Sequence, residues 1–205
     1  MKLGIFGATG TTGRHLVDLA LAAGHEVTAM VRNPSFPGFG HPRARFVVGS
    51  FDDHSAVAQT VTGQDAVVSV LGVRKGGPAT VCTDGATSIL RAMESTGVRR
   101  IVALSAHGAA ESHDASLFIR FVRSVIAEKM RDKDAMEAAI RNSGVDWTIV
   151  RPPALTNGKR TENYRFGPEL QLGWLSRISR ADVADFILRH AISESAVHKV
   201  FTVST

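Results

Sequence analysis

Three glycines near the start of the chain form the pattern with the clearest chemical meaning. Residues 7–13 read Gly-Ala-Thr-Gly-Thr-Thr-Gly and directly follow a short apolar run. Gly7 allows a tight turn, Gly10 lets the backbone approach a pyrophosphate, and Gly13 lets a helix pack closely on a strand. Because N–H groups at a helix start favour phosphate, we predict a dinucleotide site here, although a glycine turn that binds nothing is the alternative. The predicted contacts are Gly7, Thr9, Gly10, Thr11, Thr12 and Gly13.

The end of the second predicted strand indicates which dinucleotide binds. Val31 is followed by Arg32 and Asn33, and no acidic residue lies there. An acidic residue at this point binds the ribose 2′-hydroxyl of NAD, whereas an arginine accommodates the 2′-phosphate of NADP. We therefore predict NADP(H) in preference to NAD(H), with Arg32 at the phosphate. The alternative is that Arg32 is a solvated charge.

Residues after the next two strands are further candidates, because ligands bind outside the carboxyl ends of parallel strands. Phe51 follows the third predicted strand and is expected at the edge of the adenine. Leu71 and Gly72 follow the fourth strand, and Gly72 would let the backbone approach the cofactor. Arg74 and Lys75 lie just beyond them. These two cations either meet phosphate or an acidic substrate, or belong to a plain solvated turn.

The elements needed to position these residues alternate along the chain. Apolar runs predict strands at 2–6, 26–31, 44–48, 66–71, 100–104, 146–150 and 200–203. Helical spacing or capping signals predict helices over 16–23, 53–61, 83–96, about 115–142 and 180–190, with loop signals at 33–38. Continuous apolar strands separated by helices indicate an α/β fold, a single doubly wound parallel sheet (Rossmann fold) with helices on both faces. Residues 152–176 are expected to be an irregular substrate-side loop.

Composition narrows the class further. A length of 205 residues predicts one domain over 1–205, and 44% hydrophobic with 21% charged residues excludes wholesale disorder. The net charge of +5 favours acidic ligands. A single cysteine excludes an intramolecular disulfide and a cysteine-rich metal site, and we expect no metal.

Charge and hydropathy patterns also bear on partners. Charges of both signs are interspersed from Arg120 to Arg141, as on a solvated helix face, which argues against a nucleic-acid surface. No run of about 20 apolar residues is present for a membrane span, and the N-terminal apolar run is too short for a signal peptide. We expect a cytoplasmic protein with no nucleic-acid or membrane partner.

Several motifs together resemble a known family. They are the turn at 7–13, Val-Arg-Asn-Pro at 31–34, Gly-Gln-Asp-Ala-Val-Val at 63–68, the run 143–152 and the run 178–184. The chain resembles the atypical short-chain dehydrogenases with NAD(P)-binding Rossmann folds across essentially all its length. It is most similar to the NADPH-dependent flavin reductase and biliverdin-IXβ reductase type, and more loosely to NmrA-type sensors.

The resemblance implies roles for particular residues, with two departures. Ser105 stands where the family's catalytic serine stands, and Lys133 matches the lysine that holds the ribose. Lys129 occupies the place of the usual catalytic tyrosine and cannot act as a phenol. Biliverdin-type relatives carry a histidine after paired prolines, whereas here Ala154 follows them. Pro152, the first of these prolines, is a predicted cofactor contact.

The implied activity is hydride transfer from NADPH to a flavin, quinone or similar conjugated acceptor, with Ser105 as the catalytic contact. The candidate acceptor contacts are Arg74, His107, Ala154 and Tyr164. His107 would donate a proton and Tyr164 would stack on a planar acceptor, whereas a solvated loop and a core-covering ring are the alternatives. Two other functions stay open: a non-catalytic NADP(H) sensor, and an isomerase or epimerase. The expected partner is a small molecule, and the expected state is a monomer or a weak homodimer.

Overall fold

The computed structural model describes residues 1–33, 40–74, 76–114, 117–168, 170 and 172–205. Its main sheet has the strand order β3-β2-β1-β4-β5-β6-β10-β8. These strands are β1 Lys2–Phe6, β2 Glu26–Val31, β3 Ala44–Val48, β4 Ala66–Ser69, β5 Arg100–Leu104, β6 Asp146–Arg151, β8 Arg165–Gly167 and β10 Lys199–Ser204. The order 3-2-1-4-5-6 defines a doubly wound sheet, and it reverses direction between β1 and β4.

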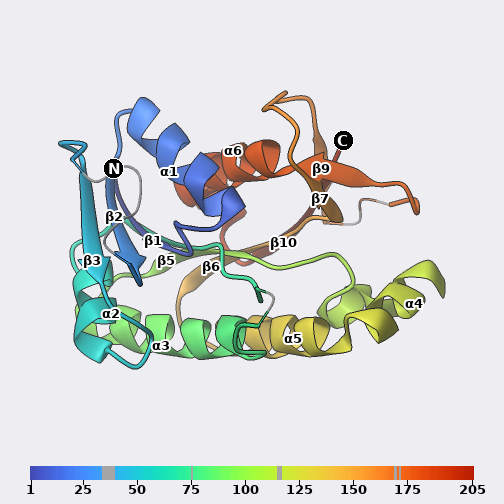
Figure 1. Ribbon diagram of the computed structural model, residues 1–205, viewed down its shortest axis with the longest axis horizontal. Helices are drawn as coiled ribbons and strands as arrows, with labels where there is room; N and C mark the ends of the chain where they lie inside the picture. Colours follow the sequence, from blue (N-terminus) through green and yellow to red (C-terminus); the bar gives the residue numbers. More distant parts are fainter. Residues whose placement is uncertain (34–39, 75, 115–116, 169, 171) are drawn as a thin grey trace.

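Helices cover both faces of this sheet (Figure 1). Helices α1 and α6 lie on one face, and α2, α3 and α5 lie on the other. The helices are α1 Thr11–Ala22, α2 His54–Val61, α3 Val81–Thr96, α4 Leu117–Val125, α5 Ala127–Arg141 and α6 Arg180–Ala191, with 3-10 turns η1 Ala110–Asp114 and η2 Glu194–Ala196. The predicted fold class is therefore confirmed.

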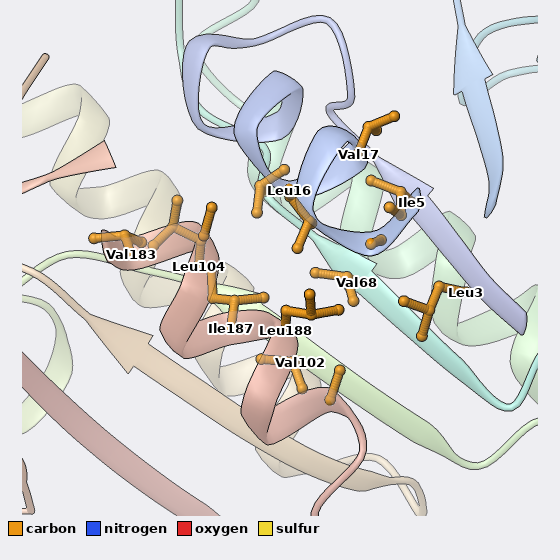
Figure 2. Close-up of a cluster of buried hydrophobic side chains, with 14 of the residues drawn as sticks. Leu3, Ile5, Leu16, Val17, Val68, Val102, Leu104, Val183, Ile187 and Leu188 are labelled. Atoms are coloured by element: carbon orange, nitrogen blue, oxygen red, sulfur yellow. The ribbon is translucent and has the colours of Figure 1, made fainter. Parts of the chain in front are cut away.

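The strands divide their apolar side chains between two cores. Leu3 and Ile5 of β1 point toward α1 and α6, where they meet Leu16 and Ile187 (Figure 2). Phe6, one residue later, belongs to the core under α2, α3 and α5. This alternation is the normal strand periodicity. Since both faces are covered, each central strand has the continuous apolar sequence that predicted it.

Two predicted features differ from the structure. The sheet is not wholly parallel, because β8 pairs antiparallel with β10 at one edge. The predicted helix over 115–142 is two helices, α4 and α5, separated at Ile126, whose φ of −115° and ψ of 36° leave the helical region. The predicted start of that helix at 115, most of the predicted loop at 33–38, and Lys75 lie outside the described residues.

The segment predicted as irregular contains short strands. β7 Ala154–Thr156 pairs in parallel with β9 Arg177–Ser179 to form a separate small sheet. Ser179 ends β9 and caps α6, because its Oγ accepts the Asp182 N–H at 2.9 Å. The predicted capping signal is confirmed, and it anchors this segment to α6.

Within the described residues, no helix combines the length and the apolar character needed to cross a bilayer.

We expect Gly13→Ala to destabilise the protein. A Cβ atom at Gly13 would lie 2.1 Å from the Gly7 carbonyl oxygen and 2.8 Å from Ala8 Cα, so α1 would have to move off β1. Overpacking of this kind lowers the free energy of unfolding by about 1–3 kcal/mol or more. Denaturant unfolding followed by circular dichroism measures the change. Gly144→Ala is the control, since a Cβ there meets nothing within 4 Å; equal stability of the two variants would contradict the packing argument.

Candidate cofactor and acceptor site

The glycine-rich turn lies at the point where the sheet reverses direction. Gly7 has a φ of +87°, and a Cβ there would lie 2.8 Å from the Val70 carbonyl oxygen just beyond β4. The Gly10 N–H donates to the Gly7 carbonyl at 2.9 Å and closes the turn. Only glycine combines this positive φ with so close an approach to the neighbouring strand.

The start of α1 differs from the starts of three other helices. Asp53 caps α2, Ser179 caps α6, and Asp132 accepts the first N–H groups of α3 at 2.8 and 3.0 Å. At α1 the N-cap is Gly10, which has no side chain, and the first turn holds no acidic residue. No side-chain acceptor for these N–H groups is recorded in the described part of the chain. This end of α1 is therefore open to an external anion.

Arg74 lies beside the same turn. Its Nη2 donates to the Thr9 hydroxyl at 3.1 Å, and its guanidinium is exposed. Gly72 leaves open space, because a Cβ built there meets nothing within 4 Å. The structure thus brings Arg74 next to the glycine-rich turn, where the pyrophosphate is predicted. Arg32 is exposed just after β2, as the 2′-phosphate prediction requires.

Phe51 and Leu71 form one wall of this region. A Cβ at Gly85 of α3 would lie 2.4 Å from Leu71 Cδ1 and 3.0 Å from Phe51 Cζ, so both side chains pack directly on the helix backbone. Phe51 also lies near Phe6, with ring centroids 6.0 Å apart. Both predicted residues are half-buried, which leaves part of each available to a ligand.

Two polar side chains follow β5 without partners. Ser105 is 5% exposed, and its Oγ has no hydrogen-bond partner among the described residues. His107 is half-buried, and its Nδ1 likewise has none there. Their backbones are fixed, because Ser105 N–H donates to Val150 O at 2.7 Å and His107 N–H to Pro152 O at 2.8 Å. A buried hydroxyl without a partner indicates a place for a ligand.

Lys133 joins the ends of two strands. Its Nζ donates to the carbonyls of Leu71 at 2.9 Å and Leu104 at 2.6 Å, and the residue is 9% exposed. The ammonium group therefore lies at the carboxyl ends of β4 and β5, the edge at which the cofactor is predicted. Lys129, one turn earlier on α5, is exposed.

The late segment positions its residues differently. Tyr164 donates its hydroxyl to Asp185 Oδ2 at 2.6 Å, and its ring packs edge-on against Phe186. Burial and the Asp185 carboxylate raise the pKa of Tyr164. Its acceptor-stacking role stays a prediction, since the structure shows contacts with α6. Ala154 is exposed at the start of β7, and Pro152 is buried.

Sequence reasoning missed several buried charges on α5. The interspersed charges over 120–141 predicted a solvated helix face, but Asp132 is 5% exposed and Glu137 is fully buried. Arg151, at the end of β6, is also buried and pairs with Glu137. The missed signal is helical spacing: Lys133 and Glu137 share a face with the apolar residues Met130, Met136 and Ile140. No group of three or more His, Cys, Asp or Glu residues in the described chain could hold a metal ion.

Comparison with known proteins identifies the family. A family model described as NAD(P)H-binding matches residues 7–194. An uncharacterised chloroplastic protein of Arabidopsis thaliana is 30% identical over 97% of this chain and 75% of its own length. The chain therefore belongs to the NAD(P)H-binding family of Rossmann-fold proteins, as the resemblance to atypical short-chain dehydrogenases indicated. An uncharacterised protein of Mycobacterium bovis is 28% identical over 96% of this chain, which spans only 21% of that protein.

Solved structures agree on the fold. A putative NAD-dependent epimerase/dehydratase from Bacillus halodurans has a TM-score of 0.84 at 25% identity and covers 100% of this chain and 94% of its own. ChuY, an anaerobillin reductase from Escherichia coli O157:H7, has a TM-score of 0.86 at 21% identity, with 99% and 96% covered. A Veillonella parvula short-chain dehydrogenase/reductase in complex with NADP has 0.83 at 22%, with 100% and 94% covered. The chain therefore shares the Rossmann fold of these three structures.

We expect His107 to be neutral at pH 7. Burial and the nearby Arg151 charge lower its pKa below the ordinary value of 6.5. The unfolded chain then binds a proton first, so the stability linked to His107 is complete above pH 6.5 and decreases as the pH falls toward the folded-state pKa. An NMR titration of the imidazole measures this, with His107→Asn assigning the resonance. A midpoint at or above 6.5 would contradict the expectation.

Proposed function

We propose that the protein is an NADPH-dependent reductase that transfers hydride to a flavin, quinone or similar conjugated acceptor. The single observation that supports this most is the buried Ser105 hydroxyl, which has no hydrogen-bond partner among the described residues and lies after β5, at the same edge of the sheet as the open start of α1. The first feature fits a nicotinamide or an acceptor, and the second fits a pyrophosphate. Together they support a site for a phosphorylated hydride donor and a second molecule.

The residues present fit the cofactor. The Gly7–Gly13 turn would receive the pyrophosphate, Arg74 would add charge beside it, and Phe51 with Leu71 would line the adenine side. Arg32 would hold the 2′-phosphate, which supports NADP(H) over NAD(H). When bound, the nicotinamide supplies the hydride, so the protein's task is to orient it and exclude water.

Ser105 and His107 would act on the acceptor. The Ser105 hydroxyl is free to donate to a carbonyl or ring nitrogen, which would stabilise charge that develops as hydride arrives. A neutral His107 could relay the accompanying proton, because one ring nitrogen can donate its N–H proton while the other nitrogen takes up a proton from solvent; direct delivery by solvent is the other route. Neither Lys129 nor Ala154 supplies a phenol or imidazole at the family's donor positions.

A sensor is the second candidate function. The absence of the catalytic tyrosine, with Lys129 in its place, favours a protein that binds NADP(H) without turnover. A stopped-flow screen with flavins, quinones and bilins distinguishes the two. Rapid NADPH oxidation with one acceptor class supports the reductase, whereas micromolar NADPH binding without oxidation by any class supports the sensor. A cofactor retained through purification would instead favour an epimerase.

We further propose that the protein is cytoplasmic and acts as a monomer or weak homodimer. Exposed apolar side chains on one face of α4 support weak self-association: Leu117 is 81%, Phe121 66% and Val125 68% exposed.

We expect Arg32→Ala to discriminate between the two dinucleotides. Loss of a charge-assisted contact to the 2′-phosphate should raise the Kd for NADPH by about 10- to 100-fold. The Kd for NADH should change little, since NADH lacks that phosphate. Fluorescence titration measures both. Arg91→Ala, an exposed arginine in the second half of α3, is the control; equal losses for NADPH and NADH would refute the assignment.

Ser105→Ala should slow hydride transfer by roughly 10- to 100-fold, on the order of one lost hydrogen-bond donor in the transition state. The Kd for NADPH should stay within about twofold, because the hydroxyl is remote from the phosphates. Single-turnover absorbance at the NADPH band gives the rate. Ser95→Ala, in the last turn of α3, provides a matched serine control. Unchanged turnover in Ser105→Ala would remove this residue from the mechanism.

A further inference from the structure

A buried ion pair lies next to the loop that carries Ser105 and His107. Arg151 is 3% exposed, and Glu137 of α5 has no exposed surface. Arg151 donates from Nε to Glu137 Oε1 at 2.9 Å and from Nη2 to Glu137 Oε2 at 2.5 Å. Two parallel hydrogen bonds of this kind fix the plane of the guanidinium. Arg151 directly precedes Pro152, whose carbonyl accepts the His107 N–H.

Glu111 completes this cluster from the far end of the loop. It lies in η1, where Oε2 accepts from Arg151 Nη2 at 2.9 Å and Oε1 accepts from Arg141 Nη2 at 2.8 Å. Burial alone would raise the pKa of Glu111, but the hydrogen bonds from Arg151 and Arg141 outweigh burial and lower the pKa to about 2. The carboxylate is therefore charged at neutral pH, and it ties η1 to both β6 and α5.

The loop is thus held at two places, at Ser105 and His107 themselves and at η1. Near β5, the Ser105 and His107 amides are bonded to the edge of β6. At η1, Glu111 binds Arg151, and the Ala110 N–H donates to Asp134 at 2.7 Å. Ser105 Oγ and His107 Nδ1 have no polar partners in the described chain to orient them. Their placement therefore depends on how the loop backbone is held.

We infer that Glu111 is a positioning residue: through Arg151 it holds the loop 105–111 so that Ser105 and His107 face the acceptor. The inference rests on the proposed reductase function. Two arginines and two glutamates balance in the cluster, so loss of Glu111 leaves an unbalanced positive charge beside His107. Because the Arg151–Glu137 pair survives that loss, the fold is retained while the loop is released.

The direct test compares Glu111→Gln and Glu111→Ala with the parent protein. We expect acceptor reduction in single turnover to fall about tenfold, the order of loss produced by a misplacement of less than 1 Å. The Kd for NADPH should stay within about twofold, since the glycine turn is not touched. Glu128→Gln is the matched control, because it removes the same charge from an exposed site on α5.

Two further readouts separate positioning from a general structural role. Sodium acetate should restore activity to Glu111→Ala, whereas sodium chloride at equal ionic strength should not, because the Glu111 side chain is 58% exposed and its place is open to a small carboxylate. Hydrogen exchange at the His107 amide should accelerate in Glu111→Gln but not in Glu128→Gln.

Failure of the Glu111 positioning role can be told apart from failure of the reductase proposal. If no acceptor is reduced by the parent protein, the reductase proposal fails, and His107 amide exchange still tests the positioning. Unchanged exchange at His107 in Glu111→Gln would overturn the inference. So would equal activity in Glu111→Gln and Glu128→Gln, or an activity loss that tracks loss of NADPH binding.

Discussion

The open N-terminus of α1 is the constraint on which the site depends. A helix start leaves N–H groups that need acceptors, and at α2, α3 and α6 aspartate or serine side chains supply them. At α1 the N-cap is Gly10, which has no side chain to accept these hydrogen bonds, and the first turn of the helix contains no acidic residue. This turn is possible only because Gly7 tolerates a positive φ and Gly13 allows α1 to pack closely against the turn. We propose that a ligand with negative charge supplies the acceptor for these N–H groups.

Helix α5 holds several neighbouring elements in place around the site. Its inward face carries charged side chains that each fix a different neighbour at the carboxyl edge of the sheet. Asp132 caps α3, Lys133 joins β4 to β5, and Glu137 holds Arg151 at the end of β6. Such buried charges are costly unless paired, so they serve geometry more than stability. The edge of the sheet at which we propose that cofactor and acceptor bind is therefore held by directional contacts as well as apolar packing.

The sequence was sufficient for the fold and for the glycine-rich turn. Short apolar runs and turn glycines are local signals, and they predicted seven of the eight strands of the main sheet and the turn at 7–13. The break at Ile126 and the strands β7, β8 and β9 were not predictable, because short pairings depend on partners distant in the chain. The buried role of Glu137 and Asp132 was missed for a similar reason. Interspersed charges of both signs are typical of a solvated helix face. Only the tertiary structure shows that Glu137 pairs with Arg151 and that Asp132 binds the start of α3.

The proposed function depends on NADP(H) binding over the amides at the start of α1. The most direct measurement is a titration of ¹⁵N-labelled protein with NADP⁺, followed residue by residue in amide NMR spectra. We expect the largest chemical-shift changes at the amides of Thr11, Thr12 and Gly13, and we expect them to saturate together with NADP⁺ binding. Saturable binding that leaves these three amides unmoved, or no binding at all, would contradict it.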